Sequence, residues 1–187
     1  MADTLISPSG VLLQRVGRHR TTPTEQKEAQ RIGLQNRQAA RRAENEALLN
    51  NANVRAFLYM TSRAEGGNYH ARYGWVAGHN EWAFTDESTH PGAGYDGRTT
   101  AAGNYQINRQ GWTEHGIRAQ GLTDFSPHTQ DLIAVEALRF RHGLDEVLSG
   151  NLQAAINKVK QNEWVAYQVK PFALCKSWFI EAGGSAQ

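Results

Sequence analysis

The sequence contains a single cysteine, Cys175, among 187 residues, so no disulfide can form within the chain. The fold therefore cannot depend on an oxidising compartment. Cys175 lies in an apolar stretch near the end of the sequence, which favours a buried packing role over a nucleophilic one. Long hydrophobic runs are also missing: no stretch approaches the roughly 18 apolar residues of a membrane-spanning helix.

The chain has little excess charge and none of the common targeting or catalytic signatures. Twenty Lys and Arg against 18 Asp and Glu leave a formal net charge of +2, too small to indicate a nucleic-acid-binding surface. The segment Met1–Gly17 lacks the basic start, apolar run and cleavage site of a signal peptide. No His-Glu-x-x-His, Gly-x-Ser-x-Gly, phosphate-binding loop or dinucleotide fingerprint occurs. We therefore expect no signal peptide, no metal and no cofactor.

Composition divides the sequence near residue 50. The first fifty residues contain no aromatic side chain, and the run Thr24–Leu49 is rich in Gln, Arg, Ala and Glu, which favours an exposed helix. Met1–Thr22 reads as mostly irregular. We predict an N-terminal, partly helical extension over 1–50 and a globular domain over 51–187. The alternative is a solvated extension that is ordered only by contact with the domain or a partner.

The domain reads as mainly helical with a glycine-rich insertion. A helix with Asn53 as its N-cap buries Val54, Phe57, Leu58 and Thr61 and ends at Gly66 and Gly67. Residues 66–103 then hold eight of the 18 glycines, which predicts loops or a small hairpin. Further helices are predicted around Tyr105–His115, after Ser126-Pro127 (burying Leu132, Val135, Leu138 and Phe140), after Gly150-Asn151, and after Pro171 (burying Leu174, Cys175, Trp178 and Phe179).

One carboxylate falls on the apolar face of the first core helix. Extending the spacing of Leu58 and Thr61 by four residues reaches Glu65, in the last turn. Burial and the negative end of the helix dipole both raise the pKa of a carboxyl group in such a place. A glutamate that stays protonated near neutral pH is what glycosidic cleavage requires. From the pattern alone, an ordinary solvated glutamate at a helix end stays as the alternative.

Aromatic and acidic residues gather in and just after the glycine-rich region. Loops can present such rings to sugars, although each ring could equally pack in the core; they are Tyr69, Tyr73, Trp75, Trp82, Phe84, Tyr95 and Tyr105. Asp86, Glu87 and Asp96 are candidates for a second carboxylate in the same cleft.

Several short segments occur in an order that resembles the phage lambda endolysin family, over residues 53–184. They are Arg55-Ala-Phe-Leu ending in Glu65-Gly66, Phe84-Thr-Asp-Glu-Ser-Thr-His-Pro91, Ala102-Gly-Asn-Tyr-Gln-Ile107, Leu122-Thr-Asp-Phe-Ser-Pro127 with Gln130-Asp131, and Phe179-Ile-Glu-Ala-Gly-Gly184. The resemblance implies an α+β, mainly helical, lysozyme-like fold. It also implies a lytic transglycosylase that cleaves the MurNAc-β-1,4-GlcNAc bond of peptidoglycan and leaves 1,6-anhydro-muramyl ends, with Glu65 as the catalytic acid and base.

The same resemblance indicates substrate-binding residues. Asp86 and His90 match the family's Phe-Thr-Asp-x-Ser-x-His-Pro stretch, and Tyr105 and Gln106 match its Gly-x-Tyr-Gln stretch. Gly103 would let the backbone approach a sugar closely, with a plain turn glycine as the alternative. To these we add Trp75, Trp164 and Tyr167 as expected cleft residues. The segment Val165–Pro171 departs from the family pattern, because it replaces a longer glycine-rich lip.

About fifty residues precede the catalytic helix here, whereas the family pattern has only a few. A helical arm of this kind could attach the enzyme to a virion or drive self-association. We expect a protein made in the host cytoplasm, or carried in the virion, that acts on glycan strands in the periplasm or cell wall. Two alternatives stay open: a hydrolytic muramidase in which Asp86 orients a water molecule for Glu65, and a non-catalytic wall-binding or virion structural protein.

Overall fold

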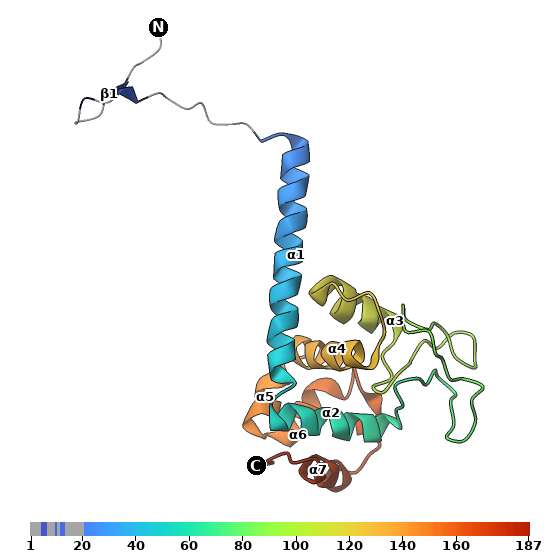
Figure 1. The fold of residues 1–187 in the computed structure, drawn as a ribbon. Helices are drawn as coiled ribbons and strands as arrows, with labels where there is room; N and C mark the ends of the chain where they lie inside the picture. Colours follow the sequence, from blue (N-terminus) through green and yellow to red (C-terminus); the bar gives the residue numbers. More distant parts are fainter. Residues whose placement is uncertain (1–4, 7–9, 11, 14–20) are drawn as a thin grey trace. The chain divides into compact units, whose positions relative to one another are not determined.

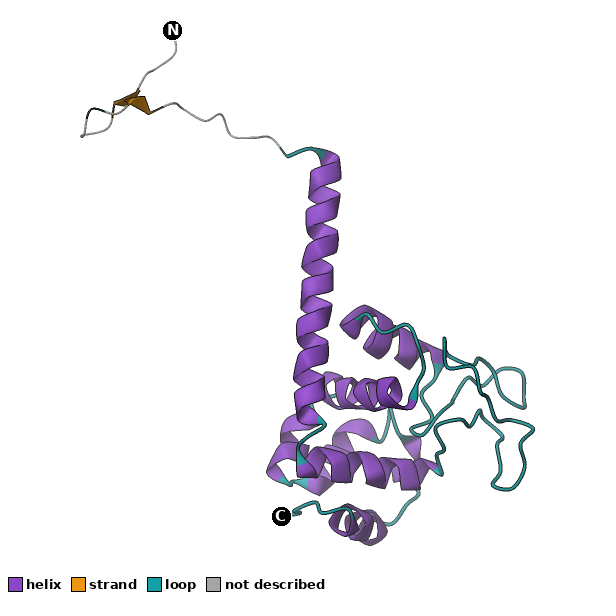
Figure 2. Cartoon of the chain, in the orientation of Figure 1, coloured by secondary structure: helices purple, strands orange, loops and turns teal. Residues whose placement is uncertain are grey.

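The computed structural model describes residues 5–6, 10, 12–13 and 21–187, and the described part is dominated by helices (Figures 1 and 2). The prediction that Met1–Thr22 is mostly irregular falls for the larger part outside these residues. In chain order the elements are β1 (Leu5–Ile6), β2 (Leu12–Leu13), α1 (Pro23–Leu48), α2 (Ala52–Glu65), α3 (Arg109–Gly111), the π-helix η1 (Trp112–Arg118), α4 (Pro127–Phe140), α5 (Leu144–Ser149), α6 (Leu152–Val159), the 3-10 helix η2 (Val165–Gln168) and α7 (Phe172–Glu181). β1 and β2 pair antiparallel, with Leu5 opposite Leu13.

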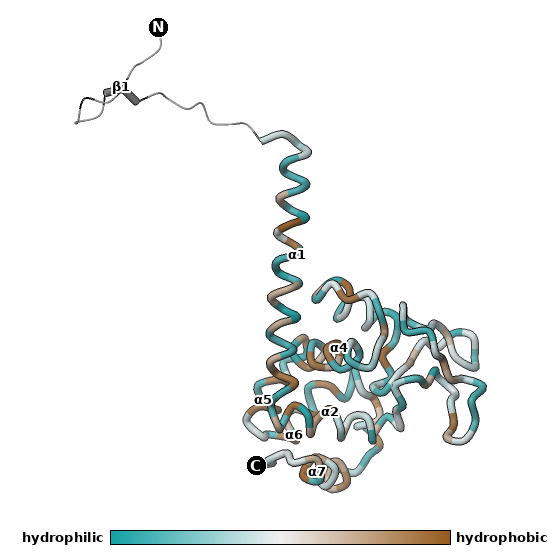
Figure 3. Tube along the Cα trace, in the orientation of Figure 1, coloured by the Kyte–Doolittle hydropathy of each residue, from teal (hydrophilic) through white to brown (hydrophobic). Residues whose placement is uncertain are grey.

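Helix α1 confirms the helix expected from the composition of this segment. It begins with reciprocal hydrogen bonds: the Glu25 N–H donates to Thr22 Oγ1, and the Thr22 N–H donates to Glu25 Oε2. Figure 3 shows that α1 is mostly hydrophilic. Although α1 has 26 residues, no helix in the described ranges is both long and apolar enough to cross a membrane.

Contacts divide the chain within α1 rather than after it. One compact unit ends at Gln35, and the other runs from Asn36 to Gln187. The second unit therefore takes in residues 36–50 of the predicted extension, while the predicted domain boundary at residue 51 stays a prediction. Residues 36–50 belong to this unit because of a polar contact, which the hydrophobic pattern of the sequence does not reveal.

That contact is made by Asn45, whose side chain is fully buried. Its amide Nδ2 donates to Gln120 Oε1 (3.0 Å) and to Glu136 Oε2 (2.9 Å), and its Oδ1 accepts from Arg139 Nη2 (3.0 Å). Nearer the middle of α1, Gln38 Nε2 donates to the backbone carbonyls of residues 117 and 118 at the end of η1. The second half of α1 is thus held by hydrogen bonds to buried groups rather than by a large apolar face.

Helix α2 forms the centre of the core. Val54, Phe57 and Met60 are completely buried, and α2 has its most extensive contacts with α7. The N-cap is Asn51, whose Oδ1 accepts from the N–H groups of residues 53 and 54, so the prediction of Asn53 is wrong by two positions. Gly66 ends the helix in the left-handed conformation at φ 64°, as predicted from the Gly-Gly pair.

The glycine-rich region forms loops, as expected, joined by isolated bridges instead of strands. Ala71 pairs with Ala83, Arg72 with Ala102, and Ala102 with Ile107. These bridges link three separate stretches of the insertion, around residues 71, 83 and 102. They position the loops that surround Glu65.

The later helices agree with prediction in type more than in detail. Ser126 caps α4 as expected, whereas the helix predicted from Tyr105 begins only at Arg109 and continues as a π-helix. Phe140 and Leu174, which were predicted to be buried, are 54% and 39% exposed. Phe140 ends α4 and stacks at the surface beneath Arg141, and Leu174 lies on the solvent side of α7. The short helix α5 was not predicted.

We expect Asn45→Ala to lower the free energy of unfolding by about 3 kcal/mol, because it leaves the buried Gln120 Oε1 without its donor and removes one hydrogen bond each from Glu136 and Arg139. Urea unfolding followed by circular dichroism measures this loss. Asn36→Ala, at an exposed position of the same helix, is the matched control and should change stability by less than about 0.5 kcal/mol. Equal effects of the two substitutions would refute the anchoring role of Asn45.

Candidate active site

Glu65 lies where the apolar spacing of α2 predicts it, at the last residue of that helix. Its side chain is partly buried and faces a hollow of about 740 Å³. The N–H of Ala166, in η2, donates to Glu65 Oε1 at 3.4 Å. The carboxyl group is therefore fixed between the end of α2 and a segment one hundred residues later in the chain.

Burial changes the acidity of this group. It raises the pKa of Glu65 from 4.5 to about 7, against the smaller opposing effects of the Ala166 N–H and the charge of Lys170. At neutral pH the side chain is thus divided between a form that can donate a proton and one that can accept it. This is the property required of a group that serves as acid and then as base.

The hollow around Glu65 is polar and is assembled from loops. We call it the Glu65 hollow; its lining residues are Glu65, Tyr73, Arg98, Thr99, Thr100, Ala101, Gln106, Asn108, Gln110, Asn162, Glu163 and Val165. Amide and hydroxyl groups predominate, with one guanidinium and two carboxylates. Side chains that both donate and accept hydrogen bonds suit a polyhydroxylated ligand.

Gln106 lines the hollow in a strained backbone conformation. Its φ is 49°, one of two positive values at non-glycine residues in the described chain. Hydrogen bonds on either side hold this geometry: Ala102 and Ile107 exchange backbone bonds, and Trp164 Nε1 donates to the Tyr105 carbonyl at 3.2 Å. Strain of this kind persists where surrounding contacts fix it and is typical of functional sites.

Other predicted residues lie behind the hollow rather than in it. Trp164 and Tyr167 are buried, and the Tyr167 hydroxyl is 2.6 Å from Thr61 Oγ1 on α2. The hydroxyls of Tyr105 and Tyr69 both donate to Asp131 Oδ1, at 2.6 and 2.8 Å. These residues support the walls of the site without lining it.

Gly103 has a packing reason for being glycine. Its φ is 74°, and a Cβ atom there would lie 2.0 Å from the Oε1 atom of Gln130. That oxygen accepts the N–H of Asn104 at 2.9 Å. Gly103 therefore lets a buried glutamine side chain reach the backbone. Of the residues that the sequence pointed to, Gln106 and the candidate ring of Tyr73 join Glu65 in the hollow.

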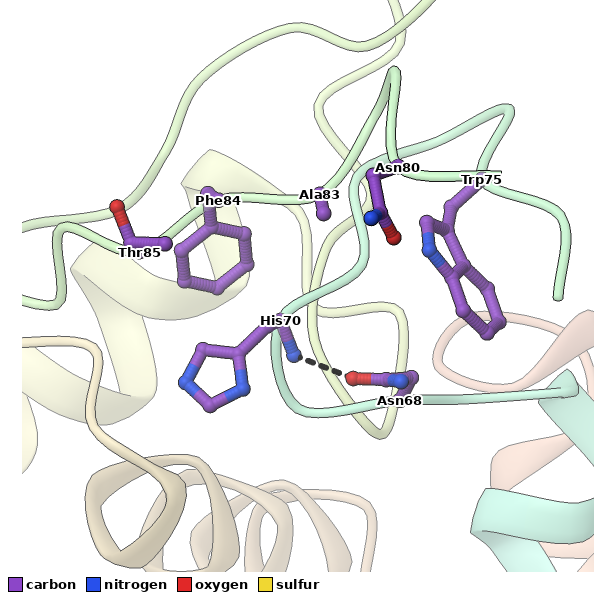
Figure 4. A pocket seen from close by; sticks show the side chains of 7 residues that line it. All are labelled: Asn68, His70, Trp75, Asn80, Ala83, Phe84 and Thr85. Carbon is purple, nitrogen blue, oxygen red and sulfur yellow. Dashed lines mark hydrogen bonds between the residues drawn. The ribbon is translucent and has the colours of Figure 1, made fainter. Parts of the chain in front are cut away.

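The structure places three predicted residues apart from Glu65. His90 is buried and donates from Nε2 to the Ile107 carbonyl, while burial lowers its pKa. Asp86 is exposed, and its carboxylate accepts the N–H of Ser88. Trp75 borders a second hollow of about 660 Å³, shown in Figure 4, which it shares with Asn68, His70, Asn80, Ala83, Phe84 and Thr85.

Sequence reasoning missed much of the lining, notably Arg98, Asn108, Asn162 and Glu163. These residues lie in irregular segments, so no periodicity marks them. Their one signal was proximity in the sequence to the matched stretch around Gln106 and to the expected cleft residue Trp164. Across the described ranges, no three His, Cys, Asp or Glu side chains are grouped so that they could hold a metal ion.

Comparisons with known proteins agree on one family. The family model described as Endolysin matches residues 55–171. The endolysin of Escherichia phage P2 is 35% identical over 94 residues, which cover 44% of this chain but only about half (54%) of that relative. The endolysin of Escherichia phage lambda is 30% identical over 151 residues, covering 71% of this chain and 92% of the relative.

Solved structures give the same result. Bacteriophage lambda lysozyme complexed with a chitohexasaccharide superposes with a TM-score of 0.63 at 28% identity, covering 73% of this chain and 97% of that structure. A second structure of the lysozyme from bacteriophage lambda gives a TM-score of 0.60 at 26% identity, with the same coverage.

Glu65→Gln should stabilise the fold in a pH-dependent way. Because the folded-state pKa of Glu65 is raised, the folded protein holds this proton more tightly than the unfolded chain, and stability falls as pH rises from 4.5 to about 7. Above pH 7 the neutral amide avoids that loss. We expect the variant to gain about 1–3 kcal/mol over the parent at pH 8 relative to pH 4, measured by urea unfolding.

The exposed substitution Glu81→Gln is the control, since it should give the same stability difference from the parent at both pH values. A Glu65→Gln difference that is equally independent of pH would contradict the raised pKa.

Proposed function

Because this chain belongs to the endolysin family, with a lysozyme-like, mainly helical fold, we propose that it is a lytic transglycosylase of peptidoglycan. The family and the fold were both predicted from the sequence, and both are confirmed. The proposed enzyme cleaves the β-1,4 bond between N-acetylmuramic acid and N-acetylglucosamine. The observation that supports this most is a carboxyl group with a pKa of about 7 in a polar hollow large enough for sugar rings.

In the proposed reaction Glu65 acts twice. Its protonated carboxyl donates to the glycosidic oxygen, and the bond from that oxygen to C1 of the muramyl sugar breaks. The resulting carboxylate then takes the proton of the C6 hydroxyl of the same sugar as O6 bonds to C1. The products are a 1,6-anhydro end and a strand with a free hydroxyl, and no water is consumed.

The protein surroundings suit both halves of this cycle. Partial burial keeps Glu65 protonated for the first step, and the Ala166 N–H stabilises the carboxylate formed in it. The rigid position at the end of α2 keeps the same group close to the sugar for the second step. Gln106, Asn108 and Asn162 supply donors and acceptors for the sugar hydroxyls.

The second hollow extends the contact proposed for a glycan strand. Asn68, which borders it, follows Glu65 by three residues, so their Cα atoms lie within about 11 Å along the chain. In Figure 4 the indole of Trp75 lies on the same side of this hollow as Asn68 and Asn80. An aromatic face with amide groups nearby suits a sugar ring. The complex of lambda lysozyme with a chitohexasaccharide supports a polymeric glycan as the ligand.

The geometry favours this reaction over the two alternatives. A hydrolase that relies on Asp86 needs that carboxylate near Glu65, yet Asp86 is exposed and bonded within its own loop. A protein that only binds the wall has no use for a partly buried acid of raised pKa. Transglycosylation requires Glu65 alone.

Product analysis tests the proposed reaction. Digestion of purified peptidoglycan should release fragments that end in 1,6-anhydro-muramic acid, lighter by one water than hydrolytic products in mass spectrometry. Glu65→Gln should reduce wall clearing by at least about a thousandfold, because the amide cannot donate the proton. Hydrated reducing ends would establish a hydrolase instead, and unchanged clearing by Glu65→Gln would exclude Glu65 as the catalytic group.

The pH dependence of kcat/KM follows from the same group. Since Glu65 must be protonated to begin the reaction, kcat/KM should fall about tenfold per pH unit above pH 7. Initial rates of wall clearing at subsaturating substrate from pH 5 to 9 measure this. A rate that stays constant from pH 7 to 9 would contradict the acid role.

A further inference from the structure

A second carboxylate, Glu163, belongs to the Glu65 hollow. It lies between α6 and η2, beside Trp164, and its side chain is only 14% exposed. Even so, it borders the hollow together with Glu65 and Gln106. No motif or helical spacing drew attention to this residue in the sequence.

The buried side of Glu163 is held by two cationic or ionisable groups. Arg141, just after α4, donates from Nε to Glu163 Oε1 at 2.8 Å. His115, only 5% exposed, places Nε2 at 3.5 Å from the same oxygen. We call these three residues the Glu163 cluster. A cavity of about 20 Å³ lies beside it, bordered by His115, Glu163, the amides of Gln106 and Asn108, and mostly apolar residues.

The position of His115 depends on the π-helix η1. Its wider turns carry residues 112–118, and Gly116 packs closely against the Ile133 side chain, where a Cβ atom would lie 3.1 Å from Ile133 Cδ1. π-helical segments are rare and occur frequently at functional sites. Two separate segments, η1 and the end of α4, thus converge on one oxygen atom of Glu163, which itself belongs to the loop before η2.

The other oxygen atom is left for the hollow. Among the described residues, Oε2 of Glu163 has no hydrogen-bond partner, and it is not one of the buried side-chain atoms that lack one. It is therefore accessible to solvent or ligand. An ionised carboxylate accepts hydrogen bonds and cannot donate them, so this atom calls for a donor from the ligand.

We propose that Glu163 is the substrate-binding carboxylate of the Glu65 hollow, with Oε1 fixed by the Glu163 cluster and Oε2 accepting a hydrogen bond from an N–H or hydroxyl group of the bound sugar. This inference rests on the proposed function. It assigns the second cleft carboxylate to Glu163 instead of Asp86, and it gives that residue a role in binding and orientation, not in proton transfer to the bond that breaks.

The chemistry of the hollow supports a fixed acceptor at this place. Asn108, Gln110 and Asn162 carry amides that can turn to donate or accept, and so adapt to different groups. Glu163 is held through one oxygen and offers only an acceptor, so it selects a donor at one point of the ligand. Hydrogen bonds to an ionised group are about twice as strong as neutral ones, and such a contact fixes orientation.

Binding without turnover tests the proposal. In the Glu65→Gln background, the dissociation constant for chitohexaose is measured by calorimetry with and without Glu163→Gln. We expect Glu163→Gln to raise it about tenfold. Asp145→Asn, which removes an exposed carboxylate on α5, is the matched charge control and should leave it within twofold. If Glu163→Gln also stays within twofold, the proposal is wrong.

A second variant separates binding from charge balance. Glu163→Gln alone leaves Arg141 without its carboxylate, and thermal unfolding should show lower stability. Adding Arg141→Gln removes the unpaired charge and should restore stability. On our proposal, the dissociation constant for chitohexaose stays about tenfold higher in this combined variant than in Glu65→Gln alone. Recovery of affinity together with stability would show that Glu163 acts only as the partner of Arg141, and would overturn the proposal.

Two further arms complete the test. The first arm repeats the binding measurement with fully de-N-acetylated chitohexaose at pH 6. If the donor to Glu163 is the sugar nitrogen, Glu163→Gln should raise the dissociation constant more than tenfold; if the donor is a hydroxyl, the increase should stay near tenfold. Either result supports the proposal. If Glu65→Gln instead cleaves peptidoglycan as fast as the parent, the proposed function is wrong. Product analysis measures cleavage separately from binding, so this failure can be distinguished from a failure of the binding proposal.

Discussion

The site depends on keeping the carboxyl group of Glu65 partly shielded from solvent at the end of α2. This requires α2 to stop at Glu65, which Gly66 achieves in the left-handed conformation, and requires η2 to cover the carboxyl from the other side. The hydroxyl of Tyr167 joins η2 to α2 through Thr61, so the two halves of the arrangement cannot move apart independently. The raised pKa of Glu65 is a product of this packing.

How far the sequence could predict the site follows from what each residue depends on. The place of Glu65 was predictable because helical periodicity extends to it from Leu58 and Thr61. The lining around it was not, since residues such as Arg98 and Glu163 come from irregular segments whose approach depends on tertiary contacts. Several short-range signals for the same feature also lie side by side: Asn50, Asn51 and Asn53 cluster at the start of α2, and Asn51 is the one that caps the helix.

The same reasoning explains the boundary of the second compact unit. A run rich in Gln, Arg and Glu predicts a helix correctly, but it offers no apolar stripe from which docking could be inferred. Asn45 attaches to the domain through hydrogen bonds to groups whose burial becomes apparent only in three dimensions. Surface exposure shows a similar limit, because Leu174 has an apolar side chain on the solvent side of α7.

Gln106 carries a consequence for engineering. In a left-handed conformation a glutamine backbone costs about 1–2 kcal/mol relative to glycine, so replacement by glycine would be an obvious route to a more heat-resistant protein. The same replacement would remove an amide from the hollow that holds Glu65. On the proposed function, this replacement would raise thermostability and lower activity, so a screen that selects only for heat resistance would favour a more stable but slower enzyme.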